Sequence, residues 1–316
     1  MNLSLFDAPP SFDKEGLARR LQDLADRRIF IGTSSWKYEG WLGQIYSRER
    51  YLSRGKFSQK HFEAECLTEF AETFPIVCGE FSFYQFPTAE FWKKLFANAP
   101  ARLQFALKVP EEVTVETFPR HARYGARAGK VNESYLNAEI FRTLFLDLLE
   151  PYRARISCLI FEFGARGASS RDFVGQIVPF FDLLPATFRY AVEVRNRDYL
   201  IDPYFDALRE HQTAHVFNAW TKMPPLCEQI ALPGAFTADF TVVRALLPAG
   251  LAYENAIVKF APYDKIQDEN PEGRRALREV IRRMQEERRS AYIFVNNRFE
   301  GNSPETIRAI TDEASS

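Results

Sequence analysis

Short apolar segments rich in β-branched and aromatic residues recur along the chain, separated by longer stretches with helical spacing. Most of these segments are nearly continuous hydrophobic runs, which is typical of strands buried on both faces of a parallel sheet. We predict eight strands from them: Ile29–Ser34, Ile76–Ser82, Leu103–Val109, Ser157–Phe163, Phe188–Val194, Ala214–Ala219, Asp239–Ala245 and Ala291–Asn296.

Helical patterns fill the stretches between the strands. They are Ser58–Phe74, Thr88–Asn98, Glu133–Leu149, Ser170–Leu184, Asp202–Glu210, Glu272–Glu287 and Ser303–Asp312. Several begin with a residue that favours helix N-termini, and we expect Ser303 to be an N-cap with Pro304 in the first turn. Alternating strands and helices indicate βαβ units, so the pattern predicts an α/β protein, a (β/α)8 TIM-type barrel of parallel strands. An open doubly wound sheet is the alternative.

Two further regions precede the first strand. Residues 12–27 have an amphipathic pattern and predict an additional N-terminal helix, whereas residues 1–11 are expected to form a flexible tail. No long Gly/Ser linker follows, which favours a single barrel-like domain over residues 12–316.

Composition excludes several classes of protein. No apolar run approaches the roughly 18 residues of a membrane span, and the N-terminus lacks the pattern of a secretory signal. The net charge of −1 provides no overall attraction for nucleic acid or an anionic membrane. The cysteines are far apart and lack a C-x-x-C pair, which indicates reduced thiols and a cytoplasmic location. They are Cys66, Cys78, Cys158 and Cys227.

Charged, amide and aromatic side chains stand where the predicted strands end, which is where TIM-type barrels carry their function. Candidate catalytic residues are Glu80, Glu162 and Glu193. Candidate ligand-binding residues are Trp36, Tyr38, Trp41, Tyr84, Lys108, Arg195, Arg244, Asn296 and Asn297. This mixture is usual for a small-molecule site, so we predict a pocket for a small polar anionic ligand, in an enzyme or an enzyme-derived binder.

Two kinds of chemistry follow from the carboxylates. Glu162 and Glu193 end adjacent strands, and their mutual repulsion is expected to raise one pKa and create an acid–base pair, as glycosidases require. Alternatively, both residues and Glu80 can hold Mg²⁺ or Mn²⁺. No sequence feature indicates an organic cofactor, because a P-loop and a dinucleotide-binding glycine motif are both missing.

Basic residues favour an anion at the same place. Arg298 is a further cation at a predicted strand end, in addition to the lysine and arginines named above. The turn at residues 301–304 precedes the last helix, and the backbone N–H groups at the start of that helix can hold a phosphate. The segment Pro119–Asn132 contains four basic and no acidic residues. We expect it to be either a solvated loop or a lid over the pocket.

Several motifs resemble, in order, the YecE-like domain of unknown function 72 family. Residues 32–47 (GTSSWKYEGWLGQIYS) are similar to its opening signature, G-T-S-G-W-x-Y-x-x-W-x-G-x-F-Y-P. Further matches are FPIVCGEFSFYQFP at 74–87, FALK at 105–108, VEVRNRDY at 192–199, VVR at 242–244 and FVNN at 294–297. The resemblance covers nearly the whole chain and implies a fold similar to a TIM barrel, without an established activity.

The chain departs from this family pattern at residues that matter for chemistry. After the second strand, Cys78 and Glu80 replace a Glu and an Asn, and family histidines become Val115, Asn196 and Leu246. The predicted pocket is therefore depleted in imidazole, which disfavours a histidine base.

The N-terminal tail suggests a different function. Asn2–Phe6 (NLSLF) resembles the bacterial sliding-clamp-binding pentapeptide Q-L-S-L-F. If the tail is used in this way, the barrel is a nucleic-acid-linked protein recruited by the clamp, with the basic segment contacting phosphates.

Overall fold

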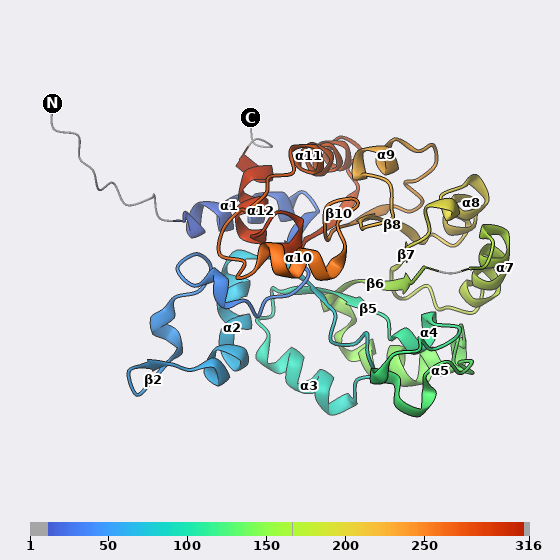
Figure 1. The fold of residues 1–316 in the computed structure, drawn as a ribbon, viewed down its shortest axis with the longest axis horizontal. Helices are drawn as coiled ribbons and strands as arrows, with labels where there is room; N and C mark the ends of the chain where they lie inside the picture. Colours follow the sequence, from blue (N-terminus) through green and yellow to red (C-terminus); the bar gives the residue numbers. More distant parts are fainter. Residues whose placement is uncertain (1–11, 166, 313–316) are drawn as a thin grey trace.

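Eight parallel strands close into a barrel in this computed structural model, which describes residues 12–165 and 167–312 (Figure 1). The strands are β1 (Ile29–Thr33), β4 (Ile76–Gly79), β5 (Gln104–Lys108), β6 (Ile156–Phe163), β7 (Tyr190–Val194), β8 (Ala214–Ala219), β9 (Phe240–Ala245) and β10 (Ser290–Val295). Each predicted strand is confirmed, with ends that shift by up to three residues. The tail and its Asn2–Phe6 motif lie outside the described residues.

The barrel closes between the first strand and its two neighbours. β1 pairs in parallel with β10 over its whole length, from Ile29 opposite Ala291 to Thr33 opposite Val295. Thr33 also pairs with Val77 of β4. A ring of pairings leaves no edge strand, so the alternative of an open doubly wound sheet is excluded.

Helices surround the strands (Figure 1). They are α1 (Lys14–Asp26), α2 (Gln59–Thr73), α3 (Ala89–Asn98), α4 (Glu111–Thr114), α5 (Ala138–Phe141), α6 (Asp147–Leu149), α7 (Ser170–Phe181), α8 (Asp202–Glu210), α9 (Leu226–Ala231), α10 (Tyr253–Phe260), α11 (Pro271–Glu286) and α12 (Ser303–Asp312). A short hairpin of β2 (Leu52–Ser53) and β3 (Lys56–Phe57) precedes α2. Within the described ranges, every helix is too short or too polar to cross a membrane.

Side-chain caps explain where several helices begin. The hydroxyl of Ser58 accepts from the backbone N–H of His61, and that of Thr88 accepts from Phe91. Each bond satisfies one of the N–H groups that the first turn of a helix leaves without a partner. The additional N-terminal helix is α1, which begins after Asp13 in the same way.

Two helix predictions were wrong. The helix expected from Glu133 begins only at α5, because Asn137 caps Ile140 and Leu136 has a left-handed φ of 49°. It then continues through a π-helical turn, Arg142–Leu146, into α6. At α12 the cap is Asn302, whose Oδ1 lies 2.9 Å from the N–H of Glu305, so Ser303 is already inside the helix.

The barrel interior changes from apolar to charged along its axis. From the amino ends of the strands to their middle, the interior contains a separate cluster of buried apolar side chains. This cluster includes the large side chains Phe240, Tyr292 and Phe294 and the smaller Cys78 and Cys158. Toward the carboxyl ends of the strands, the inward positions are polar instead: Lys108, Glu162, Glu193, Asn218 and Arg244. The apolar layers therefore lie beneath this layer of polar side chains. We call the end of the barrel that carries the polar layer the mouth.

Candidate functional site

The mouth of the barrel is formed by side chains that stand at one level on neighbouring strands. Glu162 of β6 pairs in register with Glu193 of β7, and Asn218 of β8 pairs with Arg244 of β9. Because side chains alternate between the two faces of a strand, residues in register share a face. The predicted strand-end residues are thus brought together as a layer.

One carboxylate oxygen lies at the centre of this layer. Oε2 of Glu162 is 2.9 Å from Nζ of Lys108, 3.0 Å from Nη2 of Arg195 and 2.9 Å from Nη1 of Arg244. Oε1 of the same carboxylate has no hydrogen-bond donor among the described residues. Glu162 is therefore an anion held by three cations, with one oxygen still able to accept.

Arg244 connects the remaining carboxylates. Its guanidinium contacts Glu193 and lies 2.5 Å from Oε1 of Glu80, while only 1% of its side chain is exposed. Glu193 is fully buried, and its Oε1 is 2.7 Å from Arg195 without an aligned hydrogen bond. Three carboxylates thus neutralise three cations, and only Glu80, at 36%, is substantially exposed.

The expected acid–base pair is not supported by this arrangement. Burial raises the pKa of Glu162, but the positive charges of Lys108, Arg195 and Arg244 lower it more, so its pKa lies well below the usual range. Repulsion from Glu193 is offset because Arg244 lies between the two carboxylates. The lowered pKa favours the ionised form of Glu162, whereas the acid of a glycosidase pair needs a raised pKa.

The magnesium or manganese hypothesis is also not supported. Arg244 contacts Glu80, Glu162 and Glu193, so its guanidinium occupies the position where the three carboxylates converge. Across residues 12–165 and 167–312, no group of three or more His, Cys, Asp or Glu side chains is arranged to hold a metal ion.

Two candidate ligand-binding residues are structural. Trp41 is fully buried, and its indole N–H donates to Oδ1 of Asn297 at 3.1 Å. The same oxygen accepts from the backbone of Ser303 at 2.8 Å, so Asn297 holds α12 to the loop after β1. Both side chains are buried, and Nδ2 of Asn297 has no hydrogen-bond partner among the described residues, so a role of the two residues in ligand binding stays a prediction. Asn296 is buried too, and its Oδ1 accepts from the backbone N–H of Arg298.

The other aromatic candidates lie nearer the surface. Tyr84 is 56% exposed, and the guanidinium of Arg123 is 5.0 Å from its ring. Trp36 is mostly buried and packs edge-on against Phe81. Tyr38 is half-buried beside Trp41, and burial raises its pKa to about 12 although Arg298 acts in the opposite direction. The hydroxyl of Tyr38 therefore stays protonated.

Two aromatic side chains that we had not selected also contact the charged layer. Nζ of Lys108 lies 3.6 Å from the ring centroid of Phe83, and the guanidinium of Arg195 lies 3.9 Å from that of Trp220. Cations near aromatic faces are attracted by the ring quadrupole. Trp220 directly follows β8, so its position after a barrel strand was the signal that could have identified it.

Arg298, in the short helix Asn297–Phe299 after β10, is the cation of the mouth without a counterion. Within the described residues, no carboxylate lies within ion-pair distance of it, and its Nε is buried without a hydrogen-bond partner. Its guanidinium lies 4.6 Å from the ring of Tyr253 in α10. The charges of Arg298 and Glu80 act in opposite directions on the pKa of Tyr38: Arg298 lowers it and Glu80 raises it.

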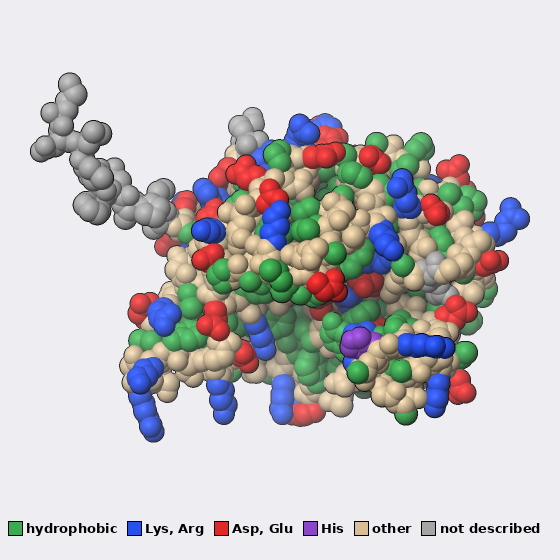
Figure 2. Space-filling model, viewed as in Figure 1, with side chains coloured by type: hydrophobic (Ala, Val, Ile, Leu, Met, Phe, Trp, Pro, Cys, Tyr) green, Lys and Arg blue, Asp and Glu red, His purple; other side chains and the backbone are tan. Residues whose placement is uncertain are grey.

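The basic segment after β5 is attached to α4. Arg123 lies 2.6 Å from Oε2 of Glu111, which also accepts from the hydroxyl of Tyr124, and Arg127 contacts Glu112. Two of its four basic residues are therefore neutralised locally. Figure 2 shows the surface hollowed between α10 and the segment that bears α4, which follow β9 and β5 at the mouth.

Comparisons with known proteins agree on the fold. A structure of a DUF72 family protein from Enterococcus faecalis V583 is 16% identical, covers 91% of this chain and 96% of its own, and has a TM-score of 0.62. A DUF72 family protein from Thermotoga maritima MSB8 is 20% identical over 91% and 99% of the two chains, with a TM-score of 0.59.

No curated protein matches the chain significantly. The family model described as "Protein of unknown function DUF72" matches residues 30–316, which confirms the resemblance to the YecE-like family. The chain therefore belongs to the DUF72 family.

Proposed function

We propose that the barrel mouth binds a small polar anionic ligand whose negative group is held by Arg298. The observation that carries this proposal is the missing counterion of Arg298. The other mouth cations are neutralised by Glu80, Glu162 and Glu193, whereas Arg298 has no carboxylate partner in the described part of the chain. A half-buried cation without a partner is costly unless a ligand supplies the negative charge.

The surrounding groups suit the polar remainder of such a ligand. Tyr38 keeps its proton and can donate to the negative group. Oε1 of Glu162 and Oε2 of Glu80 have no donor among the described residues, so both can accept from ligand hydroxyls. Sugar phosphates and sugar acids combine a negative group with hydroxyls, and they are the ligand class that this arrangement fits.

If the ligand is turned over, Glu80 is the carboxylate best placed to exchange a proton with it. Its exposed fraction of 36% gives access from solvent, while Glu193 is fully buried and Glu162 is held by three cations. We therefore assign Glu80 the role of general base and Glu162 that of an electrostatic anchor for the mouth cations.

A thermal-shift titration tests this proposal. The probes are ribose 5-phosphate, gluconate, glucose and inorganic phosphate, because a ligand at about 100 times its Kd stabilises by about 2.7 kcal/mol. We expect the two anionic sugars to raise the Tm and glucose to leave it unchanged. Arg298→Ala should abolish the shift.

Arg48→Ala is the matched control. The guanidinium of Arg48 also lies over an aromatic ring, 5.1 Å from Phe57, and has no carboxylate partner in the described residues. Its removal changes the net charge equally and should leave the shift intact. Equal shifts in wild type and Arg298→Ala would exclude Arg298 as the anion site. If neither ribose 5-phosphate nor gluconate stabilises wild type, the anionic-sugar proposal is wrong and the tail motif Asn2–Phe6 becomes the leading hypothesis.

A further inference from the structure

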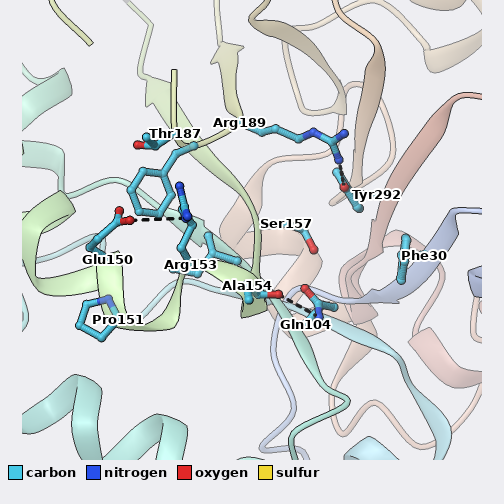
Figure 3. A pocket seen from close by; sticks show the side chains of 12 residues that line it. Phe30, Gln104, Glu150, Pro151, Arg153, Ala154, Ser157, Thr187, Arg189 and Tyr292 are labelled. Carbon is cyan, nitrogen blue, oxygen red and sulfur yellow. Dashed lines mark hydrogen bonds and ion pairs between the residues drawn. The ribbon is translucent and has the colours of Figure 1, made fainter. Parts of the chain in front are cut away.

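A second cavity opens at the opposite end of the barrel, where the strands begin. Its volume is about 590 Å³, within the range of small-molecule sites. Phe30 of β1, Gln104 of β5 and Tyr292 of β10 line it, together with side chains from the segments before β6 and β7 (Figure 3). No residue of this cavity belongs to the mouth described above.

A β-bulge places one hydroxyl in the cavity. Phe105 pairs with Ile156 and Ala106 with Cys158, so the intervening Ser157 has no partner in β5. Ser157 lines the cavity between Gln104 and Tyr292, and its hydroxyl has no hydrogen-bond partner among the described residues (Figure 3). Bulges at barrel rims redirect side chains in this way.

One wall of the cavity is held in place by backbone contacts. This wall is the short helix Glu150–Arg155, and Arg155 donates to the carbonyl of Pro100 at 2.6 Å and to that of Leu103 at 3.1 Å. These bonds attach the short helix to the segment between α3 and β5.

A positively charged hydrogen-bonding pair lies at the edge of the cavity. Nη1 of Arg189 donates to the hydroxyl of Tyr292 at 2.6 Å, and its guanidinium lies 5.3 Å from the ring of Phe240. Arg189 also forms an ion pair with Asp239, whose Oδ2 lies 3.5 Å from Nη2 of the arginine. Burial raises the pKa of Tyr292 although Arg189 acts against it, so the phenol stays protonated. Because its oxygen already accepts from Arg189, its proton is free to be donated.

The lining combines these donors with aromatic surface. Each of its two arginines has one carboxylate partner: Arg153 lies 3.5 Å from Glu150, and Arg189 lies 3.5 Å from Asp239, which is outside the lining. Phe30 and Phe188 add aromatic surface, and the ring centroids of Phe30 and Tyr292 are 5.7 Å apart. An occupant that complements this lining has a planar apolar body and one negative group.

We propose that this cavity is a binding site for a small aromatic monoanion, such as an aromatic carboxylate. The carboxylate accepts from Arg189, from the hydroxyl of Tyr292 and from Ser157. The ring packs against Phe30 and Phe188. The site is distinct from the mouth in position and in the ligand that it takes.

Calorimetric titration of the full chain with benzoate tests this proposal. Wild type and Arg298→Ala are both titrated, so that a contribution from the mouth is identified separately. We expect saturable benzoate binding in both proteins. Acetate, which lacks the ring, and benzyl alcohol, which lacks the charge, should each bind at least about tenfold more weakly, as expected when a pocket interaction or a charged hydrogen bond is lost.

Three variants locate the site. Arg189→Met removes the charge, Tyr292→Phe removes the donor, and Ser157→Leu fills the cavity; each should weaken benzoate binding by about tenfold or more. Arg142→Met is the matched control, because Arg142 is similarly exposed (49% against 43%) and also lies beside a carboxylate.

The outcomes separate this proposal from that for the mouth. Unchanged affinity in both Arg189→Met and Tyr292→Phe, or the absence of saturable binding to wild type, overturns it. Tyr292→Phe keeps the ring and the packing, so it remains informative if Arg189→Met fails to fold. Loss of binding only in Arg298→Ala would assign benzoate to the mouth and likewise overturn the proposal.

Discussion

The guanidinium of Arg244 contacts the carboxylate of Glu193 at the centre of the barrel, and neither side chain is more than 1% exposed. A buried ion pair contributes little net stability, because the desolvation of both charges offsets their attraction. Removing one partner is different, because the other charge then stays buried without compensation. The same guanidinium also contacts Glu80 and Glu162, so three carboxylates depend on it.

Arg244→Met should therefore destabilise the protein strongly. It leaves three carboxylates around a neutral side chain, and we expect the free energy of unfolding to fall by about 3–5 kcal/mol. Urea denaturation measures this change. Arg282→Met, at an exposed arginine that is also paired with two glutamates, should have little effect. Similar stability of the two variants would contradict a central role for Arg244.

The low pKa of Glu162 predicts an acid-dependent contribution to stability. The folded-state pKa lies below the value in the unfolded chain, about 4.3, because the attraction of Lys108, Arg195 and Arg244 exceeds the effect of burial. The contribution is complete above the unfolded pKa and is lost as pH falls through the folded pKa.

Glu162→Gln should accordingly be less stable than wild type near neutral pH, and the difference should narrow on acidification. Urea denaturation at about pH 7 and about pH 3 measures both proteins. Glu139→Gln, at an exposed carboxylate paired with Arg142, is the comparison and should show little change. Parallel acid profiles for wild type and Glu162→Gln would show that Glu162 does not carry the effect.

Two histidines should influence stability in opposite directions as pH changes. Burial lowers the pKa of His215 to about 3 in the folded protein. As pH falls below about 6.5, this histidine is therefore protonated in the unfolded chain before it is protonated in the folded protein. Between these two pKa values, His215 should lower the free energy of unfolding by about 1.4 kcal/mol for each unit that the pH falls. Its Nδ1 lies 3.1 Å from the hydroxyl of Tyr204 in the barrel wall.

His211 provides the control of opposite sign. Burial lowers its pKa, but hydrogen bonds to the carbonyl of Ala207 and to Asp182 raise it more. Its stabilisation is thus present below about pH 6.5 and is lost as pH rises through the folded pKa. His215→Leu should flatten the acid slope of the free energy of unfolding between about pH 6 and pH 4, and His211→Leu should leave that slope unchanged. His211→Leu should instead remove a loss of stability that wild type shows as pH rises above about 6.5. An acid slope that His215→Leu leaves unchanged would contradict the assignment of His215, and an unchanged loss above about pH 6.5 in His211→Leu would contradict that of His211.

Adjacent asparagines at the end of β10 should differ in function. Asn297→Ala removes the acceptor for Trp41 and for the backbone of Ser303, so we expect a loss of about 2 kcal/mol or more of unfolding free energy. Asn296→Ala releases the backbone of Arg298 instead, and we expect weaker binding of the anionic sugars. Urea denaturation and the thermal-shift titration distinguish the two. If Asn297→Ala is as stable as wild type, its assignment as a structural residue is wrong.

The strands and their order of connection were predictable from local pattern alone. Continuous apolar runs such as Cys158–Phe161 occur where both faces of a strand are buried, and caps such as Ser58 and Thr88 act on a backbone N–H three residues away. Such signals lie within one element, and the ends of parallel strands meet at one rim whatever the side chains are. Sequence therefore indicated which residues surround the mouth.

Only the tertiary structure decided how those residues pair and which of them reach solvent. Lys108, Arg195 and Arg244 share a single oxygen of Glu162, and this cluster comes from three strands and the residue that follows β7, so no spacing along the chain encodes it. Trp41 and Asn297 meet across 256 positions. The sequence by itself determined the barrel and the members of its mouth. Their charge states and their partners were decided only by the tertiary structure, because electrostatic attraction and burial depend on distance in space.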